Sequence, residues 1–515
     1  MAAIITDDFR RNQAELLVND IKASLETAYN SGSPTSTMQD QHRTNSIYAI
    51  GLGKTDKWPN DILSKTEDSL DFTISPPSGS QQEDADVINN LFTLKEVSSA
   101  GVNRLIAKNA WTSGRKYKVY DSSDNDCFYA TGDVYPSYVT HNDQIYLCVS
   151  NTALSTGASD PIGATTAPTH TGQTIASTVD SYVWAHIQAL PSSGPQAKFV
   201  TPQFVPVLEA DAAAIANSDT HQGGLLSHIG ITDGGTGYTS TTVVTVTAVN
   251  TSGVAVDLSA TYQFLPIVSG SGVIERIEIQ ASGTTGDTGN LTYWNGTVLK
   301  DLRSASVSIT DAAQPGTSRQ AVASALVAPT RGFATHAVST LPTWFIGVIA
   351  EFVGTEGGDA QALKFRQVSL VKNFVRNDDS DGSLASYDGL KYITCASIAS
   401  LSLEPGDILT QAVSGSKFYF DYIEGTNLYY HQNSNGEVNF IDPIVGSNTI
   451  EVFQTATATV GADVATSITS IHDGEFPHRD PTNTEFNGEV IFLENRVPFA
   501  RAATQTEEVK LIVQL

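Results

Sequence analysis

Short apolar runs separated by turn residues recur along most of this chain, and the last residues show the pattern most clearly. Residues 490–493 form a compact apolar run. Further on, four apolar residues alternate with mostly polar neighbours: Val509, Leu511, Val513 and Leu515. Alternation with a period of two is typical of a strand that buries one face. The segment 487–515 therefore predicts two strands that close a sheet as a hairpin, with an edge or a bend at Val497 and Pro498.

Near the N-terminus the apolar period is that of a helix. Five apolar residues recur at helical spacing: Ala14, Leu17, Val18, Ile21 and Leu25. Thr6 is suited to cap this helix, and Asp7 and Asp8 would lie at the positive end of its dipole. We therefore expect an amphipathic helix near 7–26, followed after a polar stretch by a buried strand over 46–53.

Runs rich in Val, Ile, Thr and Tyr recur between turn residues over 87–190 and again further along the chain. This composition favours strands. At 515 residues the chain is too long for one core, since domains average roughly 100–200 residues. The sequence therefore predicts a mainly β, multi-domain protein with a few short helices.

The chain is strongly acidic, with 55 Asp and Glu against 29 Lys and Arg and a formal net charge of −26. Such a charge repels nucleic-acid phosphates and anionic lipid head groups, so we expect no nucleic-acid partner. No apolar run has the length of about 18 residues that membrane insertion needs, and the N-terminal residues lack the apolar core of a signal peptide. We expect synthesis in a cytoplasm. Three widely spaced cysteines, Cys127, Cys148 and Cys395, indicate reduced, inert thiols.

One acidic segment has the ligand spacing of an EF-hand calcium loop. Oxygen-bearing side chains fall at loop positions one, three, five and twelve: Asn377, Asp379, Asp381 and Asp388. Position one is Asn, however, position twelve is Asp rather than a bidentate Glu, and no helical pattern follows. A solvated acidic turn is therefore favoured over a calcium site, and we expect no metal and no cofactor.

No sequence motif of a catalytic site is present. The chain contains no G-x-S-x-G, no Walker A sequence and no strand-linked G-x-G-x-x-G. Its five tryptophans could form a sugar-stacking platform, but scattered tryptophans more often belong to a core. We therefore expect that the protein is not an enzyme.

Arginines in polar segments of so acidic a chain are expected to pair with carboxylates through their planar guanidinium groups. Three arginines and three glutamates are candidates for such pairs, as structural or interface residues: Arg366, Arg496, Arg501, Glu494, Glu507 and Glu508. An internal brace between the two C-terminal strands is favoured over a contact with another subunit, and both remain open.

The C-terminal segment carries the spacing G-E-x-I-x-x-E-N-R-x-P over residues 488–498, followed by Q-T-E-E at 505–508. This spacing resembles the C-terminus of the baseplate wedge subunit of T-even-type contractile-tailed bacteriophages, the product of gene eight. Other segments resemble the same family in the same order. They are the strand over 46–53 with its polar turn, D-x-Y-V-W at 180–184 and F-R-Q-V-S-L at 365–370.

The resemblance implies a β-sandwich framework that is interrupted by inserted small β domains. The boundaries that we expect are 1–204 for the N-terminal framework, 205–340 for an inserted module, 341–385 for framework strands, 386–470 for a second inserted domain and 471–515 for the C-terminal framework strands. The first insertion contains GGxGYT over 234–239, in which glycines would take positive φ at a tight turn and Tyr238 would cover the sheet edge.

The resemblance also implies a function. It predicts a homodimeric structural subunit that joins neighbouring wedge proteins, is assembled in the host cytoplasm, and rearranges in the virion tail baseplate on contraction. The Thr-, Gly- and Ser-rich insertions leave an alternative, a host-receptor or polysaccharide-binding tail protein of the adhesin or depolymerase type. That alternative predicts a trimer with exposed aromatic grooves and close carboxylate pairs.

Overall fold

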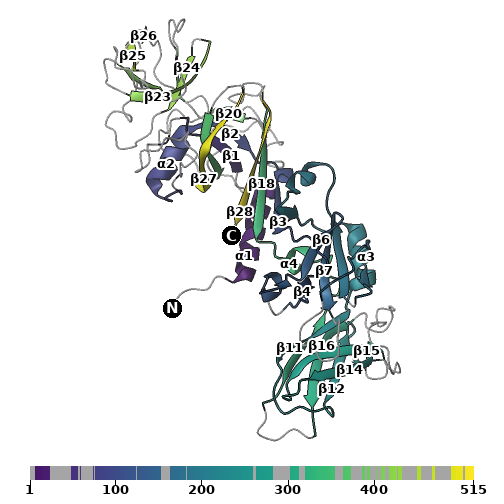
Figure 1. Ribbon diagram of the computed structural model, residues 1–515. Coiled ribbons are helices and arrows are strands. Elements are labelled where there is room, and N and C mark those ends of the chain that lie inside the picture. The colour runs from purple at the N-terminus through teal and green to yellow at the C-terminus, as the bar shows by residue number, and fades with distance from the viewer. Residues whose placement is uncertain are drawn as a thin grey trace. The chain divides into compact units, whose positions relative to one another are not determined.

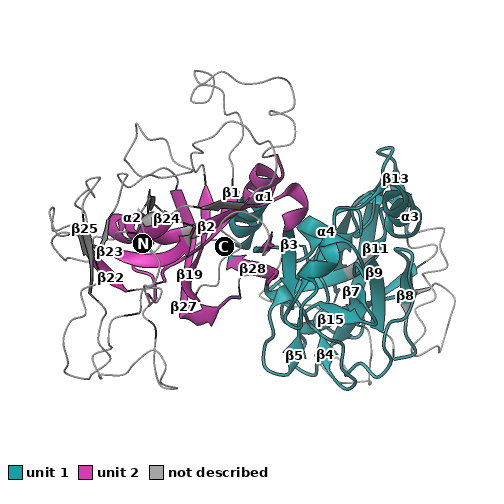
Figure 2. Ribbon diagram, turned by 90° about the horizontal axis from the view of Figure 1, so that it is seen from above, with its two compact units in different colours: residues 1–15, 103–346, 514–515 teal, residues 16–102, 347–513 magenta. Residues whose placement is uncertain are grey.

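A computed structural model of the protein describes residues 6–23, 48–55, 58, 74, 76–122, 125–151, 163–180, 182–258, 262–281, 302–312, 319–353, 364–372, 386–388, 391–394, 403, 407–411, 417–425, 427–431, 449–453, 467–469, 489–502 and 505–515. The chain divides into two compact units, coloured separately in Figure 2. Unit 1 comprises 1–15, 103–346 and 514–515, and unit 2 comprises 16–102 and 347–513. We describe each unit by itself.

The predicted N-terminal helix is confirmed as α1 (Asp7–Ala23). The Thr6 hydroxyl accepts a hydrogen bond of 3.2 Å from the Phe9 backbone N–H, which is the expected capping contact. One face of the helix is fully buried, through Ala14, Val18 and Ile21. A second helix, α2 (Gln81–Asn90), begins at Ser80, whose side chain accepts from the Glu83 backbone N–H.

A five-stranded antiparallel sheet in unit 2 gathers segments that lie far apart in the sequence (Figure 1). Its strands, in spatial order, are β20 (Ser386–Asp388), β2 (Leu91–Glu96), β1 (Tyr48–Gly53), β19 (Lys364–Lys372) and β27 (Glu489–Ala500). All six residues of β1 are buried, which confirms the predicted buried strand. A strand between two neighbours has both edges paired and both faces available for packing, which suits its apolar composition.

The predicted C-terminal hairpin is wrong, although both of its strands exist. β27 pairs with β19, whereas β28 (Glu507–Gln514) lies beside β18 (Phe345–Phe352) in a different sheet. Each strand finds its partner in a distant segment rather than in its neighbour along the chain. β27 runs on through Pro498, and its register against β19 shifts between Phe365 and Gln367, the place where an irregularity was expected.

A six-stranded antiparallel sheet in unit 2 lies within the second predicted insertion. Its spatial order is β21 (Lys391–Thr394), β24 (Asn427–His431), β23 (Lys417–Glu424), β22 (Ile408–Gln411), β25 (Thr449–Phe453) and β26 (Ser467–Thr469). Phe418, Leu428 and Tyr430 are buried in this sheet. The short strand β20, at the start of the same predicted range, pairs with β2 instead.

Unit 1 contains several small sheets. One four-stranded sheet has the spatial order β6 (Tyr138–His141), β7 (Gln144–Asn151), β9 (Tyr182–Ala189) and β8 (Ile175–Ser177). Two short strands, β4 (Lys116–Tyr117) and β5 (Val134–Tyr135), form a parallel pair. β10 (Phe204–Pro206) pairs with β3 (Val102–Ala107). Two helices accompany them, α3 (Ala212–Gln222) and α4 (Ala337–Thr340).

The first predicted insertion supplies the remaining strands of unit 1, and these strands pair only with one another in the described part of the chain. They are β11 (Leu226–Asp233) with β17 (Val322–Val327), β12 (Val243–Asn250) between β13 (Ala255–Asp257) and β16 (Leu302–Thr310), and β14 (Tyr262–Val268) with β15 (Ile274–Ala281). One hydrophobic core nevertheless runs from Ile106 to Trp344 and joins this segment to the preceding one. The predicted boundary at 204/205 therefore lies inside one compact unit.

The GGxGYT turn has the predicted backbone. Gly235 and Gly237 have φ of 62° and 80°, in the region that favours glycine. Tyr238 is buried, and its hydroxyl oxygen accepts a hydrogen bond of 2.7 Å from the Ala321 backbone N–H. The tyrosine thus fixes the turn to the residue that precedes β17.

The predicted fold class is confirmed. The molecule is mainly β, with many antiparallel sheets and few helices. Of the helices in the described ranges, none has the length and apolar character required to cross a membrane.

Candidate functional site

Three of the segments that resemble the wedge family are neighbouring strands. β19 contains the F-R-Q-V-S-L segment, and it pairs on one side with β1 and on the other with β27, which carries E-N-R-x-P. Gln367 of β19 stands opposite Gly53 and Asn495. Its side-chain Nε2 donates to Asn495 Oδ1 at 2.9 Å. The polar residues of two separate motifs therefore contact each other directly.

Arg366 lies in the interior of unit 2. The residue is 2% exposed, and its Nη1 donates a hydrogen bond of 2.6 Å to the carbonyl oxygen of Thr55. The Thr55 hydroxyl in turn donates to Oδ1 of Asp421, a fully buried carboxylate on β23. This chain of contacts connects β19 with the six-stranded sheet. The Arg366 side chain thus takes part in an internal connection of unit 2 through Thr55.

Arg496 lies beside two aromatic rings on β27 and β19. Its guanidinium carbon is 5.8 Å from the ring centroids of both Phe365 and Phe499, a cation–π distance. The Arg496 carbonyl oxygen accepts a hydrogen bond of 3.0 Å from Trp58 Nε1. Its side-chain Nε is buried and has no hydrogen-bond partner within the described residues. Glu494, two positions before it, is exposed.

Arg501 and Glu507 form a buried ion pair in the segment between β27 and β28. Nε of Arg501 is 3.3 Å from Oε2 of Glu507, with the side chains only 0% and 8% exposed. Gln505 completes the arrangement, because its carbonyl oxygen accepts from Arg501 Nη2 at 3.0 Å and its Nε2 donates to Glu507 Oε1 at 3.2 Å. Glu508 instead pairs with Lys510 at 2.9 Å, in a more exposed position. The segment is held by internal charges.

The calcium-like loop has one of its four predicted ligands within the described residues. Asn377, Asp379 and Asp381 lie outside the described residues. Asp388 belongs to β20, where it stands opposite Thr93 of β2. Over the ranges that the structure describes, no group of three or more His, Cys, Asp or Glu side chains is arranged to hold a metal ion.

Two of the five tryptophans belong to the core of unit 1. Trp184 and Trp344 are 0% and 4% exposed, so neither offers a face to a sugar ring. Trp294 lies outside the described residues. Cys127 and Cys148 are free and buried, and burial raises the pKa of the Cys148 thiol, which keeps it protonated. Cys395 lies outside the described residues.

A buried polar cluster in unit 1, around His186 and Gln222, was not predicted from the sequence. His186 Nδ1 accepts from the Gln173 backbone N–H at 3.0 Å, so its Nε2 carries the proton and donates to Gln144 Oε1 at 2.8 Å. Burial, together with the nearby His170 ring, lowers the pKa of His186 to about 4. The imidazole is therefore neutral near pH 7.

Gln222 satisfies both ends of its carboxamide in this cluster. Nε2 donates to the carbonyl oxygens of Gln173 at 2.8 Å and His186 at 2.9 Å, and Oε1 accepts from the Ala334 backbone N–H at 3.1 Å. These three partners are 36 to 112 residues away along the chain, and Oε1 also accepts from the Ser218 hydroxyl of the same helix at 3.2 Å. No local spacing could have predicted the three distant partners.

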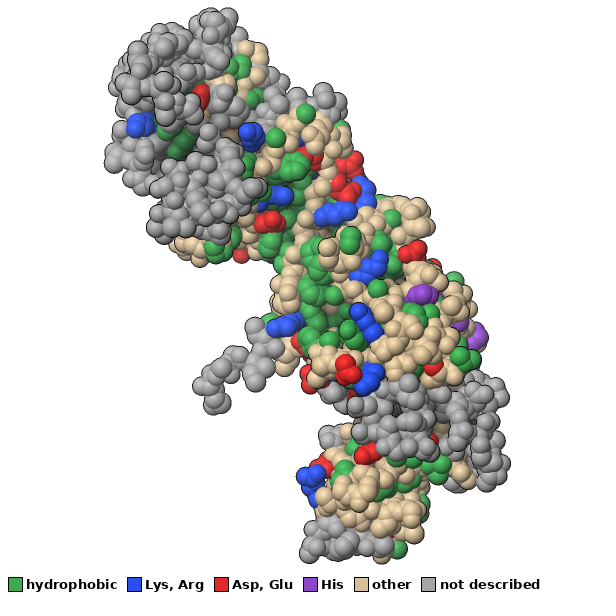
Figure 3. Space-filling view, viewed as in Figure 1, with side chains coloured by type: hydrophobic (Ala, Val, Ile, Leu, Met, Phe, Trp, Pro, Cys, Tyr) green, Lys and Arg blue, Asp and Glu red, His purple; other side chains and the backbone are tan. Residues whose placement is uncertain are grey.

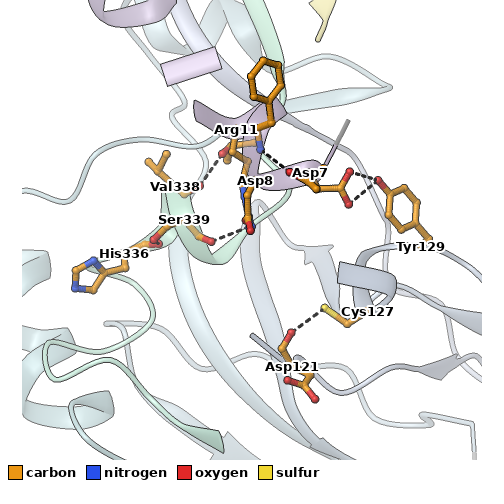
Figure 4. Close-up of polar contacts among 12 residues, drawn as sticks. Asp7, Asp8, Arg11, Asp121, Cys127, Tyr129, His336, Val338 and Ser339 are labelled. Atoms are coloured by element: carbon orange, nitrogen blue, oxygen red, sulfur yellow. Dashed lines mark hydrogen bonds and ion pairs between the residues drawn. The ribbon is translucent and has the colours of Figure 1, made fainter. Parts of the chain in front are cut away.

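A second polar network surrounds the start of α1 in unit 1 (Figure 4). The Tyr129 hydroxyl donates to both carboxylate oxygens of Asp7, at 3.1 and 3.2 Å, and Arg11 Nη1 donates to the Ser339 carbonyl oxygen at 3.0 Å. The Tyr129 ring stacks on Trp344 with centroids 5.9 Å apart. The polar face of the first helical turn is thereby attached to the segments around η2 (Asn125–Phe128) and α4.

Charged side chains are scattered over the coloured part of the face drawn in Figure 3. On the face drawn in Figure 3, Lys and Arg side chains are isolated among acidic, apolar and uncharged atoms, and no continuous basic surface is visible among the coloured residues. Such a distribution fits the acidic composition of the chain.

Comparison with known proteins identified no relative. No protein-family model matches the chain, and no curated protein matches it significantly. The assignment of a function therefore depends on the residues and contacts described above.

Proposed function

We propose that the protein is a structural subunit of a phage tail baseplate wedge, which joins neighbouring wedge proteins, forms a homodimer and repacks when the tail contracts. Its work is binding, not catalysis. It would be assembled in the host cytoplasm and reside in the virion tail baseplate. The two insertions would supply further surfaces for neighbouring subunits, since specific interfaces require sizeable buried areas.

The observation that carries this proposal is the meeting of three family-like segments in the sheet β1–β19–β27. The three segments are separate in the sequence, and they lie more than four hundred residues apart at their extremes. A chance resemblance gives no reason for them to be adjacent strands. The Gln367–Asn495 hydrogen bond makes the support specific, because each partner belongs to a different motif.

The contacts of the candidate residues support a framework role for these motifs. Arg366 binds Thr55 in the interior of unit 2, and Arg501 pairs with Glu507 between β27 and β28. Such contacts between strands would hold the framework together when the tail contracts. Packed elements change between discrete arrangements rather than deforming continuously, so a framework of this kind would move as a unit. Arg496 differs, since its guanidinium lies beside two aromatic rings and its buried Nε has no hydrogen-bond partner within the described residues.

Electron microscopy of virions that contain the chain tests the proposal. Antibody fragments raised against unit 1 should label the baseplate ring, and soluble protein should compete the label away as a control. Label at a fibre tip would overturn the proposal and favour the receptor-binding alternative. A mass measurement in solution adds a second test, in which a dimer is expected and a glycan-binding trimer is not.

A further inference from the structure

A pocket of about 100 Å³ lies beside Arg496 in unit 2. Its walls come from the end of β27, the start of β19 and the first half of β28. The apolar surface comes from Phe365, Phe499, Val509 and Leu511, and the charged groups are Arg496, Lys510, Glu494 and Glu507. Half of the lining side chains are charged, so the pocket suits a ligand that carries a charge of its own.

The guanidinium of Arg496 is held in place, but its Nε lacks an acceptor within the described residues. The two phenylalanine rings fix its position, and its buried Nε makes no hydrogen bond within the described part of the chain. A buried N–H without an acceptor costs free energy, and proteins rarely leave one unsatisfied. Because the rings already restrict the side chain, a ligand that supplies the acceptor would lose little conformational entropy on binding.

The charges around Arg496 leave it available for a carboxylate. Glu507 is paired with Arg501 at 3.3 Å, and Lys510 is paired with Glu508 at 2.9 Å. Glu494 is exposed and can remain in solvent. Guanidinium groups favour carboxylates because two parallel N–H donors match the two oxygens.

Exposed apolar side chains of β27 surround the pocket, as in a surface that binds another protein. Three large hydrophobic side chains of β27 are exposed, Ile491 at 38%, Val497 at 56% and Phe499 at 40%. Apolar contacts that surround a charged anchor are characteristic of interface hot spots. β27 is the last strand of its sheet, but Pro498 and the shifts in register oppose the addition of another strand, so contact through side chains is favoured.

We propose that the Arg496 pocket binds the carboxylate of an Asp or Glu side chain, which a partner protein presents between apolar residues. This inference rests on the proposed function, since a neighbouring subunit would be the partner. The carboxylate accepts from the Arg496 guanidinium, and the flanking apolar residues cover Val497 and Phe499.

Selection from a random peptide library at physiological ionic strength, with the full-length protein as the target, tests the pocket directly. Enriched peptides should share an Asp or Glu with apolar neighbours. Arg496→Gln should weaken their binding at least tenfold, and replacing the peptide's acid by its amide should have a similar effect. The two changes together should cost no more than either alone, because each removes the same contact.

Two further variants serve as controls. Arg303→Gln removes an exposed arginine of β16 and should leave peptide affinity unchanged. Arg496→Lys keeps the charge but not the planar donor pair, so it should bind with intermediate affinity, and it replaces Arg496→Gln if that variant does not fold. Absence of enrichment, enrichment of peptides without an acid, or affinity that is insensitive to both Arg496 variants would each overturn the inference.

A second copy of the chain is the competing occupant. If Arg496→Gln lowers the mass of the free protein in solution, the pocket is filled by that copy and the proposal is overturned. Neither measurement depends on the place of the protein in a virion. If the pocket does not bind a carboxylate, the baseplate proposal is therefore unaffected. If the antibody fragments label a fibre tip, the result for the pocket is unaffected.

Discussion

The carboxamide nitrogen of Gln222 donates a hydrogen bond of 2.9 Å to the carbonyl oxygen of His186, and so attaches the end of α3 to β9. Gln222 also binds Gln173 and Ala334, and its side chain is fully buried. One residue thereby holds three separate segments of unit 1. The contact crosses the boundary predicted at 204/205, which explains why the residues on both sides share one core.

Gln222→Leu should destabilise unit 1 strongly. The substitution leaves two carbonyl oxygens and one N–H buried without partners, and each such group costs roughly 1–3 kcal/mol. After partial relaxation we expect the free energy of unfolding to fall by about 3 kcal/mol, as measured by urea denaturation. Gln263→Leu, at an exposed position of β14, is the control and should change it by less than about 0.5 kcal/mol. Equal effects of the two substitutions would contradict the role of Gln222.

Acid should weaken the same cluster. The pKa of His186 is about 4 in the folded protein against an ordinary value of 6.5, so protonation favours the unfolded chain. The stability due to the neutral imidazole is complete above pH 6.5 and is lost as the pH falls towards 4, by about 2 kcal/mol. Protonation of Nδ1 would also abolish its hydrogen bond from the Gln173 N–H.

Unfolding free energies measured between pH 7 and 4.5 would show this loss. His186→Gln should be less stable than the wild type at pH 7 but should depend less on pH. His336→Gln, which removes an exposed histidine, should keep the wild-type slope. An unchanged slope in His186→Gln would rule out His186 as the source.

The Arg501–Glu507 pair should show strong coupling. Removal of one partner leaves a buried, unpaired charge, so Arg501→Met and Glu507→Gln should each cost about 3 kcal/mol of unfolding free energy. The double variant should be more stable than the sum of the single effects predicts, by about 1–3 kcal/mol. Lys510→Gln and Glu508→Gln, in the exposed pair, should show coupling below about 0.5 kcal/mol in the same chemical denaturation experiment. Additive effects at 501 and 507 would show that the two charges act independently.

Gly235→Ala should disturb the turn that carries Tyr238. An alanine Cβ there would lie 2.6 Å from two backbone atoms, Ala321 N and Arg319 O, at a φ of 62°. Gly253 is a matched control, because its φ is 79° but a Cβ would meet nothing within 4 Å. Gly253→Ala should cost about 1 kcal/mol, for the backbone alone, and Gly235→Ala about 2 kcal/mol more. Thermal unfolding measures the difference, and similar melting temperatures would show that the crowding is relieved elsewhere.

Local features of this fold could be predicted from the sequence, and long-range pairings could not. The capping contact of Thr6, the burial of Tyr48–Gly53 and the positive φ of Gly235 each depend on a few neighbouring residues. The partner of β28 depends on which distant strand offers a matching edge, and the hairpin prediction failed for that reason.

In the candidate site, too, local features could be predicted from the sequence and long-range contacts could not. The sequence brought attention to Arg366, Arg501 and Glu507, because their charge and polar setting are visible locally. It did not reveal the Arg366–Thr55 contact, whose partners are 311 residues apart, nor the two rings that hold Arg496. The distant contacts of a buried amide such as Gln222 have no local signal, since only the folded backbone brings together the carbonyl groups that it binds.

The pairing of β1 with β19 has a consequence for biosynthesis. About 310 residues separate the two strands, so at ~5–20 residues per second a ribosome needs roughly 15–60 s to make the second after the first. β1 can pair with β2 during that time, but the backbone N–H and C=O groups of its other edge remain unpaired until β19 is made. Residues 103–346 emerge within the interval and can fold first. The five-stranded sheet that contains β1 and β19 would then form last. The nascent chain thus carries an exposed strand through most of its synthesis, and its yield in cells should depend on chaperones that shield such an edge.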